Sequence, residues 1–187
     1  MSVSSYALTT LGSVKTYLGI SDSSRDTLLE SLINSASALV EKYTGRYFVV
    51  RAAIAELHDG EAGCENIKLK YYPVTAVASV KVDGVTADAS LYSVDKEAGL
   101  VRMSGGWSRG EQNVEVVYSA GMAAATADVP GDLQLACQML VSLFFNRRDA
   151  SVERQTLGDY SISYAANERG LPLTVAAMLE RYTGRSL

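Results

Sequence analysis

Apolar residues recur with a helical period at both ends of the chain and alternate with polar residues in the middle. At the ends, hydrophobic positions are three or four residues apart, which is the repeat of an amphipathic helix. The middle is rich in β-branched and aromatic residues, which favour strands. The pattern therefore predicts an N-terminal helical segment over 1–46, a β-rich insertion over 47–120 and C-terminal helices over 121–187 that complete a bundle with the first.

Two helices are predicted in the first segment. The shorter covers 11–18, with one of the two preceding threonines as its N-cap and Gly19 at its end. The longer covers 24–44 and carries a continuous apolar stripe. Its cap is expected to be Ser23 or Ser24, and Gly45 is expected to terminate it.

The middle segment is predicted to form a small antiparallel sheet or barrel. Turn signals separate its short apolar runs: Asp59-Gly60 and Asp83-Gly84 are turn dipeptides, and the glycine-rich stretch 105–113 is predicted to be a loop. The candidate strands are 47–57, 67–71, 76–82, 91–95, 99–103 and 113–119.

The last segment returns to the helical pattern. A helix beginning after Pro130 and ending near Arg147 is apolar around most of its circumference, so it is expected to be the central buried helix. A polar connection over 149–158 follows, then one strand or extended arm over 159–165, and a final helix from Pro172. Because strands and helices do not alternate, the order excludes a Rossmann fold and predicts an α+β fold: about four helices with an inserted β portion.

Charge and composition exclude several classes of function. The net charge is −4, whereas proteins that grip nucleic acid by its phosphates carry clustered Lys and Arg. Cys64 and Cys137 are too far apart in sequence to suggest a disulfide framework and are interpreted as free thiols. No signal peptide or membrane span is predicted, so we expect a soluble protein made in the cytoplasm.

No catalytic, cofactor-binding or metal-binding residue is predicted. His58 is the only histidine, and with two distant cysteines it makes a zinc site improbable. Nucleophile and phosphate-binding motifs are missing from the sequence. Carboxylates such as Asp83, Asp88 and Asp95 are scattered through turns. A carboxylate-dependent hydrolase therefore stays an alternative that a deep pocket with two or more carboxylates would support.

Tyrosines and terminal arginines are the candidate interface residues. The chain has 11 tyrosines but only 3 phenylalanines, and tyrosine is enriched at protein interfaces. Paired arginines at a helix end compensate the helix dipole or contact an acidic partner. The candidate set is Tyr71, Tyr72, Arg147, Arg148, Tyr160 and Tyr164.

The order of motifs along the chain resembles the head–tail connector, or adaptor, proteins of tailed bacteriophages. The similarity covers nearly the whole chain: YLGI, then LINSASALVEKYTGR, then YYPV followed by VASVKVDG, then VPGDLQLA and a helix that ends in arginines. None of these motifs is catalytic, so the resemblance depends on their order. It implies a non-enzymatic virion protein of the neck, the junction between head and tail. Another neck protein, a stopper or tail-completion protein, is the alternative.

The resemblance also implies partners. Such adaptors form a ring of about a dozen copies under the portal, extend the DNA channel, and offer a platform to a stopper or tail-completion protein. DNA would only pass through, and neither a cofactor nor a membrane is involved. The C-terminal segment, 171–187 here, commonly docks on the portal. The candidate docking residues are Met178, Leu179, Arg181, Tyr182, Arg185 and Leu187.

Overall fold

Over the residues that the structure describes, the fold consists of four α-helices and three antiparallel sheets, which confirms the predicted α+β class. In this computed structural model the described residues are 2–146, 154–157, 160–163 and 171–183. The chain divides into two compact units: 1–45 with 125–185, called here the helical unit, and 46–124, called the β unit. The sequence pattern had placed these boundaries after 46 and after 120.

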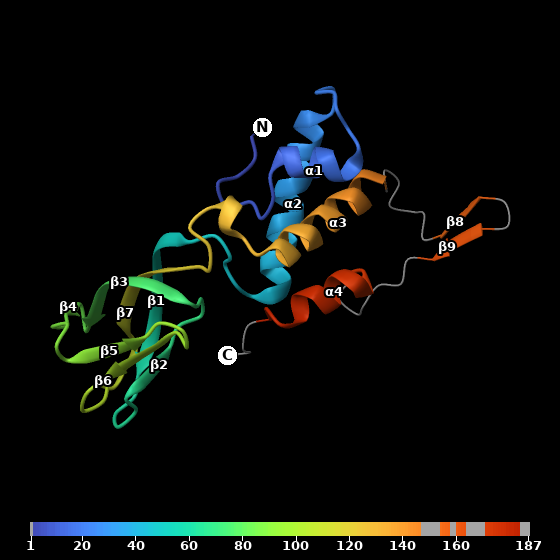
Figure 1. The fold of residues 1–187 in the computed structure, drawn as a ribbon. Coiled ribbons are helices and arrows are strands. Elements are labelled where there is room, and N and C mark those ends of the chain that lie inside the picture. The colour runs from blue at the N-terminus through green and yellow to red at the C-terminus, as the bar shows by residue number, and fades with distance from the viewer. Residues whose placement is uncertain (1, 147–153, 158–159, 164–170, 184–187) are drawn as a thin grey trace. The chain divides into compact units, whose positions relative to one another are not determined.

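The helical unit joins the beginning of the chain to its end. Its helices are α1 (Leu11–Leu18), α2 (Asp26–Thr44), α3 (Gly131–Asn146) and α4 (Leu173–Glu180), with a short 3-10 turn η1 (Thr126–Asp128) before α3. Helix α3 packs against the other three, and Figure 1 shows it between α1 and α4. The expectation of a central helix at this position is confirmed. Its fully buried residues are Leu133, Ala136, Cys137, Leu140 and Val141.

The ends of α1 and α2 follow the sequence signals, except at the start of α2. Thr10 caps α1 by accepting a hydrogen bond from Ser13 N at 3.1 Å. Gly19 and Gly45 end α1 and α2, both with φ of +68°, in the left-handed region that glycine enters without strain. The predicted serine cap of α2 is wrong: the N-cap is Arg25, which makes no side-chain cap bond. The preceding serines instead form a local turn.

Buried polar groups tie the N-terminal segment to the helices. Ser37 Oγ on α2 accepts a hydrogen bond from Leu8 N at 3.0 Å and lies 3.5 Å from Cys137 Sγ on α3. Burial raises the pKa of the Cys137 thiol to about 11, so this cysteine stays a neutral, packed side chain. Cys137 and Cys64 are both free, as expected.

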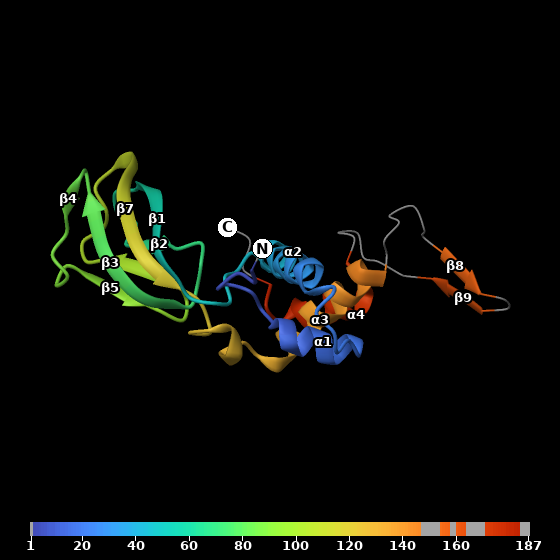
Figure 2. The ribbon, with the colours of Figure 1, turned by 90° about the horizontal axis from the view of Figure 1, so that it is seen from above.

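The β unit is built from two antiparallel sheets around one apolar core. Its strands are β1 (Arg51–Gly60), β2 (Asn66–Lys68), β3 (Val74–Val82), β4 (Val85–Thr86), β5 (Tyr92–Asp95), β6 (Leu100–Met103) and β7 (Gly110–Ala120). One sheet has the order β1-β7-β3-β4 and the other β2-β6-β5. Figure 2 shows β7, in yellow, beside β3, in green. Core residues include Val80, Val101, Trp107, Val116 and Tyr118.

Of the two predicted turn dipeptides, Asp83-Gly84 forms a hairpin turn and Asp59-Gly60 does not. Asp83 and Gly84 have φ of +52° and +79° and join β3 to β4. Asp59-Gly60 is not a turn: it lies in β1, where Gly60 pairs with Gly110 of β7. A Cβ on Gly60 would lie 1.9 Å from Ser108 O, so glycine serves a close strand approach here. The predicted loop 105–113 accordingly contributes its last residues to β7.

A third sheet consists of β8 (Arg154–Leu157) and β9 (Tyr160–Ser163), which pair antiparallel. The sequence pattern predicted one strand over 159–165 and assigned 149–158 to a polar connection. The assignment of 154–157 is therefore corrected: this segment is the partner strand. The sequence of 154–157 is mostly polar, so it lacks the alternation of apolar and polar residues from which a strand is predicted.

Gly121 offers a test of the close packing at the start and end of the β unit. Its φ is +151°, and an added Cβ would lie 2.5 Å from Val50 Cα. We predict that Gly121→Ala lowers the free energy of unfolding of the β unit by about 3 kcal/mol, because backbone atoms must move apart. Urea unfolding followed by the fluorescence of Trp107, the single tryptophan, measures this.

Gly105→Ala is the matched control. Gly105 also has a positive φ, +85°, but no atom lies within 4 Å of an added Cβ. Only the backbone strain remains, about 1 kcal/mol. Equal losses from the two substitutions would contradict the steric account.

Candidate interaction surfaces

Tyr71, a predicted interface residue, belongs to an aromatic stack in the β unit. Its ring lies on that of Tyr47, with centroids 3.9 Å apart and an interplanar angle of 15°. The Arg51 guanidinium lies 3.9 Å from the Tyr47 ring centroid, and Lys70 Nζ lies 5.3 Å from that of Tyr71. Such cation–π contacts stabilise a packed cluster. Half-buried Tyr71 therefore already packs within its own unit.

Tyr72 is held in a similar way. The Arg46 guanidinium lies 4.1 Å from its ring centroid, and Arg46 Nε donates a hydrogen bond to Tyr72 O at 3.3 Å. Both tyrosines remain partly exposed. Contact of either with a partner stays a prediction.

Of the other four interface candidates, one lies in a described strand and three lie outside the described residues. Arg147, Arg148 and Tyr164 lie outside the described residues. Tyr160 begins β9 and pairs in register with Leu157 of β8.

A half-buried carboxylate, Glu56 of β1, connects its own strand, β7 and the segment between β2 and β3 through hydrogen bonds. The Tyr118 hydroxyl donates a short bond to it, Lys70 N donates at 3.1 Å, and His58 Nε2 lies 3.2 Å away. Tyr118 Oη also accepts from Tyr71 N at 3.1 Å. The sequence drew attention to His58 only as the single histidine. Glu56 and Tyr118 were missed, since the only signal for them is that both occupy positions in long strands.

The network determines the charge of its members. Burial alone would raise the pKa of Glu56, but the bonds from His58, Tyr118 and Lys70 N outweigh it, so the pKa is lowered. Burial and the same carboxylate raise the pKa of Tyr118, which therefore remains a neutral donor. The arrangement is a structural clamp between strands.

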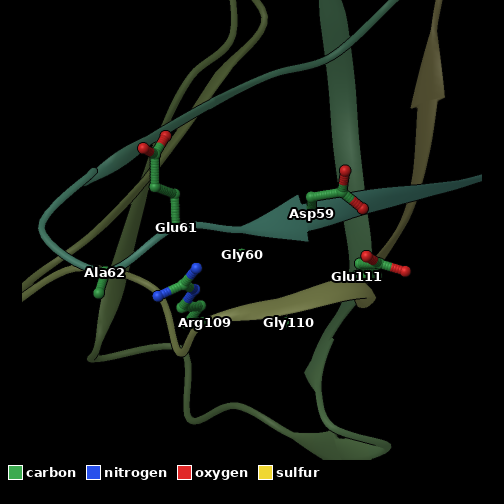
Figure 3. Close-up of a pocket in the computed structure, with 7 residues that line it drawn as sticks. All are labelled: Asp59, Gly60, Glu61, Ala62, Arg109, Gly110 and Glu111. Carbon is green, nitrogen blue, oxygen red and sulfur yellow. The ribbon is translucent and has the colours of Figure 1, made fainter.

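A hollow at the far end of β1 contains three carboxylates, and Figure 3 shows them around paired Gly60 and Gly110. Asp59 and Glu111 lie on one side, whereas Glu61 lies on the other near Arg109. All three carboxylates are exposed, and Asp59 Oδ1 accepts a hydrogen bond from Gln112 N at 2.6 Å. General acid–base catalysis needs groups that converge on a substrate shielded from water. This open hollow offers no such geometry.

Metal-binding clusters of at least three His, Cys, Asp or Glu are absent from the described part of the chain. No helix there is long and apolar enough to cross a membrane.

Helix α4 and the turn that follows it contain two of the predicted docking residues in buried positions. Leu179 is fully buried and Tyr182 is 6% exposed, and with Leu171 and Val175 they form one stripe against the helical unit. These two side chains are therefore core residues in this structure. Only Met178, half-buried, and Arg181, exposed, lie at the surface among the described candidates; Arg185 and Leu187 fall outside the described residues.

The turn after α4 is fastened to the start of α3. The Tyr182 hydroxyl donates a hydrogen bond to Asp132 Oδ1 at 2.9 Å, and Arg181 Nη2 lies 2.5 Å from Asp132 Oδ2. Asp132 occupies the first turn of α3, where the helix dipole favours a negative charge. We call these three residues the α3–α4 latch.

An apolar groove runs over the second half of α3, between α1 and α4. Met139 and Leu143 of α3 and Val175 of α4 line it, and Tyr17 of α1 forms part of its wall. Its volume is about 330 Å³. Asn146, the last residue of α3, and Pro172, just before α4, also line it.

Comparison with known proteins identifies the family. The family model described as head completion protein matches residues 7–184, so the chain belongs to the head completion protein family. No curated protein matches it significantly.

Three solved structures share its fold. A chain in the neck of a native gene transfer agent (GTA) particle, computed with C12 symmetry, aligns with a TM-score of 0.69 and 20% identity, covering 100% of this chain and 94% of that one. A chain in the virion of the native particle aligns with a TM-score of 0.70 and 20% identity, covering 100% of this chain and 95% of that one. A chain in the neck of the empty particle, computed with C6 symmetry, aligns with a TM-score of 0.69 and 18% identity, covering 100% of this chain and 96% of that one.

The Glu56 network predicts a specific pH dependence. The pKa of Glu56 is lower in the folded chain than its ordinary value of 4.5. The ionised carboxylate therefore stabilises the fold at pH values above 4.5, and this contribution is lost as the pH falls through the folded-state pKa. Near pH 6, Glu56→Gln should lower the free energy of unfolding by about 1–3 kcal/mol relative to the unchanged chain. This difference in unfolding free energy should become smaller as the pH falls below about 4, because Glu56 is then increasingly protonated in the unchanged chain. Urea unfolding monitored by Trp107 fluorescence measures it; exposed Glu111→Gln is the control, and a gap independent of pH would contradict the assignment.

The latch predicts a loss of helical stability. Tyr182→Phe keeps the buried ring but leaves Asp132 without the hydroxyl, which should cost about 1–2 kcal/mol. The readout is urea unfolding followed by helical circular dichroism. Tyr17→Phe, at a ring that is 45% exposed, is the matched control and should change little. An effect of Tyr182→Phe no larger than that of the control would refute the latch.

Proposed function

We propose that this chain is a non-enzymatic subunit of a virion neck, where it acts as the adaptor that joins a DNA-filled head to the next component of the tail. One observation supports this most strongly: chains of the same fold along their whole length occur in the neck of a gene transfer agent particle. The family match to head completion proteins agrees with that assignment. The site of action is then the head–tail junction of a tailed phage or a related particle.

A closed ring is the assembly that we propose, with twelve copies as in the C12 symmetry of the similar neck. In a cyclic ring every contact joins two different surfaces of the same chain, and the rotation must close. The partners on the two faces of the ring are a portal and a stopper or tail-completion protein. DNA passes through, and the net charge of −4 disfavours a firm grip on its phosphates.

The adaptor role is favoured over that of a stopper by the helical unit. Helices α2 and α3 span 19 and 16 residues and form a bundle core with α4. Stoppers and tail terminators tend to be β-rich throughout, and helices of this length disfavour those classes. A hydrolase is a weaker candidate because the carboxylates of the hollow in Figure 3 are exposed and do not converge.

Portal docking by the C-terminal segment remains part of the proposal, restricted to its surface. Removing 171–187 would take Leu171, Val175 and Leu179 out of the core, so that deletion tests folding and not docking. The residues available for contact are Met178 and Arg181, together with Arg185 and Leu187 beyond the described part.

A shorter truncation therefore tests portal docking. We predict that a chain ending at Thr183 unfolds at the same urea concentration as the full chain but binds the cognate portal at least about tenfold more weakly. Sedimentation with purified portal rings measures the affinity. Exposed Thr16→Ala, on α1, is the surface control. Unchanged portal binding by the truncated chain would remove the C-terminal segment from the proposal.

Disrupting the gene in its phage or prophage tests the function as a whole. We expect filled or leaking heads without tails, seen by negative-stain electron microscopy, and recovery of complete particles when the intact chain is supplied. Complete, tailed particles without the protein would contradict a neck function.

A further inference from the structure

Three cations of the β unit meet at the stretch of chain from Lys70 to Thr75, called here the cationic segment. Lys70 begins it and is exposed. The Arg46 guanidinium lies 4.1 Å from the ring centroid of Tyr72, and Arg46 Nε donates a hydrogen bond to Tyr72 O at 3.3 Å. Exposed Lys96 donates from Nζ to Thr75 O at 3.0 Å. The segment spans at most roughly 18 Å, so the three charges are close enough to meet one extended ligand.

These three cations are not neutralised by the chain itself. None of them forms an ion pair within the described residues. Other cations do: Lys15 Nζ lies 2.7 Å from Asp26 Oδ1, and Lys81 Nζ lies 2.8 Å from Glu115 Oε2. A group of accessible positive charges without carboxylate partners attracts an anionic ligand.

Positive and negative charges are separated along the first sheet of the β unit. Val74, within the cationic segment, pairs with Ala120 of β7, and so does Arg51 at the start of β1. The three exposed carboxylates of the hollow in Figure 3 surround Gly60, which ends β1 and pairs with Gly110. Strand β1 is about 30 Å long, so the cations and these carboxylates lie at opposite ends of the sheet. The net charge of −4 therefore does not describe the end that carries the cations.

The tyrosine rings beside the cations are occupied by one another and by arginines. Tyr47 and Tyr71 stack with centroids 3.9 Å apart, and the Arg51 guanidinium lies 3.9 Å from the Tyr47 centroid. Proteins that bind single-stranded nucleic acid stack bases on aromatic faces, and here those faces already hold tyrosine or arginine. Stacking on Tyr72 instead fixes the orientation of the Arg46 guanidinium, which suits it to a phosphate.

We propose that the cationic segment, with Arg46 and Lys96, is a contact site for the phosphate backbone of double-stranded DNA. The inference rests on the proposed neck function, which brings duplex DNA past every subunit. The three side chains supply charge and N–H donors, which bind phosphate without reading the base sequence. A duplex presents one charge per roughly 1.7 Å of its axis on a stiff rod. Duplex DNA is therefore favoured over a flexible acidic peptide, which loses conformational entropy when it is ordered on the surface.

Three phosphate contacts make a weak site, which suits DNA that has to pass through the neck. Each contact contributes about −0.9 to the slope of log K against log salt concentration, so a slope of about −3 is expected for one chain. In the proposed ring, the sites of all copies act on the same DNA, and their weak contacts add up.

Duplex binding by the purified full chain tests the site. The measurement is the fluorescence anisotropy of a labelled DNA duplex of mixed sequence, repeated over a series of low salt concentrations. Lys70→Gln and Lys96→Gln should each weaken binding at least about threefold and reduce the magnitude of the salt slope by about 1. Arg109→Gln removes an exposed cation from the opposite end of the sheet and should change neither quantity. Glu97→Gln removes an exposed opposing charge next to Lys96 in sequence and should strengthen binding.

Two results would overturn the DNA contact. One is a chain that binds no duplex at low salt, or whose binding is weakened equally by Lys70→Gln, Lys96→Gln and Arg109→Gln. The other is tighter binding of a labelled poly-glutamate peptide than of the duplex, which would assign the cationic segment to an acidic protein partner. Urea unfolding followed by Trp107 fluorescence should give the same midpoint for these exposed-residue variants as for the unchanged chain.

A photo-crosslinker tests the contact in the assembled particle. A chain in which p-benzoylphenylalanine replaces Lys70, incorporated together with the unchanged chain, should cross-link to packaged DNA on irradiation. The same group in place of Arg109 should not. Cross-links from position 70 to protein alone would overturn the proposal. The duplex measurement needs no portal, so its failure leaves the proposed ring intact, whereas complete particles without the gene would refute the neck function itself.

Discussion

The burial of α3 against α1, α2 and α4 is the interaction on which the structure depends. Helix α3 follows the β unit, whereas α1 and α2 precede it, so the core of the helical unit is complete only when distant parts of the chain meet. The contact of Ser37 with Cys137 spans 100 positions in the sequence. The β unit is consequently an insertion within a helical bundle, and its first and last residues are held close together by the Val49–Ala123 bridge.

This constraint changes how the C-terminal segment can act. Leu179 and Tyr182 belong to the core, and the latch to Asp132 fastens the turn that follows α4. Over the described residues 171–183, the segment can therefore present its outer side, with Met178 and Arg181, without unfolding part of the bundle. The groove over α3 is likewise a surface whose shape depends on the packing of the bundle.

Sequence reasoning succeeded where the signal is local. Helical periodicity and terminating glycines predicted α1 and the end of α2 at Gly45, and Asp83-Gly84 predicted the β3–β4 hairpin, because each depends on a few neighbouring residues. The order of motifs also identified the family correctly, since the head completion model matches 7–184.

The signals that failed depend on residues far apart. Asp59-Gly60 has the composition of a turn, but Gly60 is required for the close approach of Ser108. The pairing of Glu56 with Tyr118 joins positions 62 residues apart. The burial of Leu179 and Tyr182 follows from α4 packing on α3, which the sequence of α4 alone does not reveal, because an exposed docking helix and a packed one share the same apolar spacing.

The central claim is that this chain closes into a ring on a portal. Native mass spectrometry of the purified chain with its cognate portal, over a series of concentrations, tests it most directly. The account predicts one dominant complex in which twelve copies are added to each portal, the symmetry of the similar neck, with no ladder of partly filled rings at saturation. A chain that stays monomeric beside an intact portal, or that binds in open-ended numbers, would contradict it.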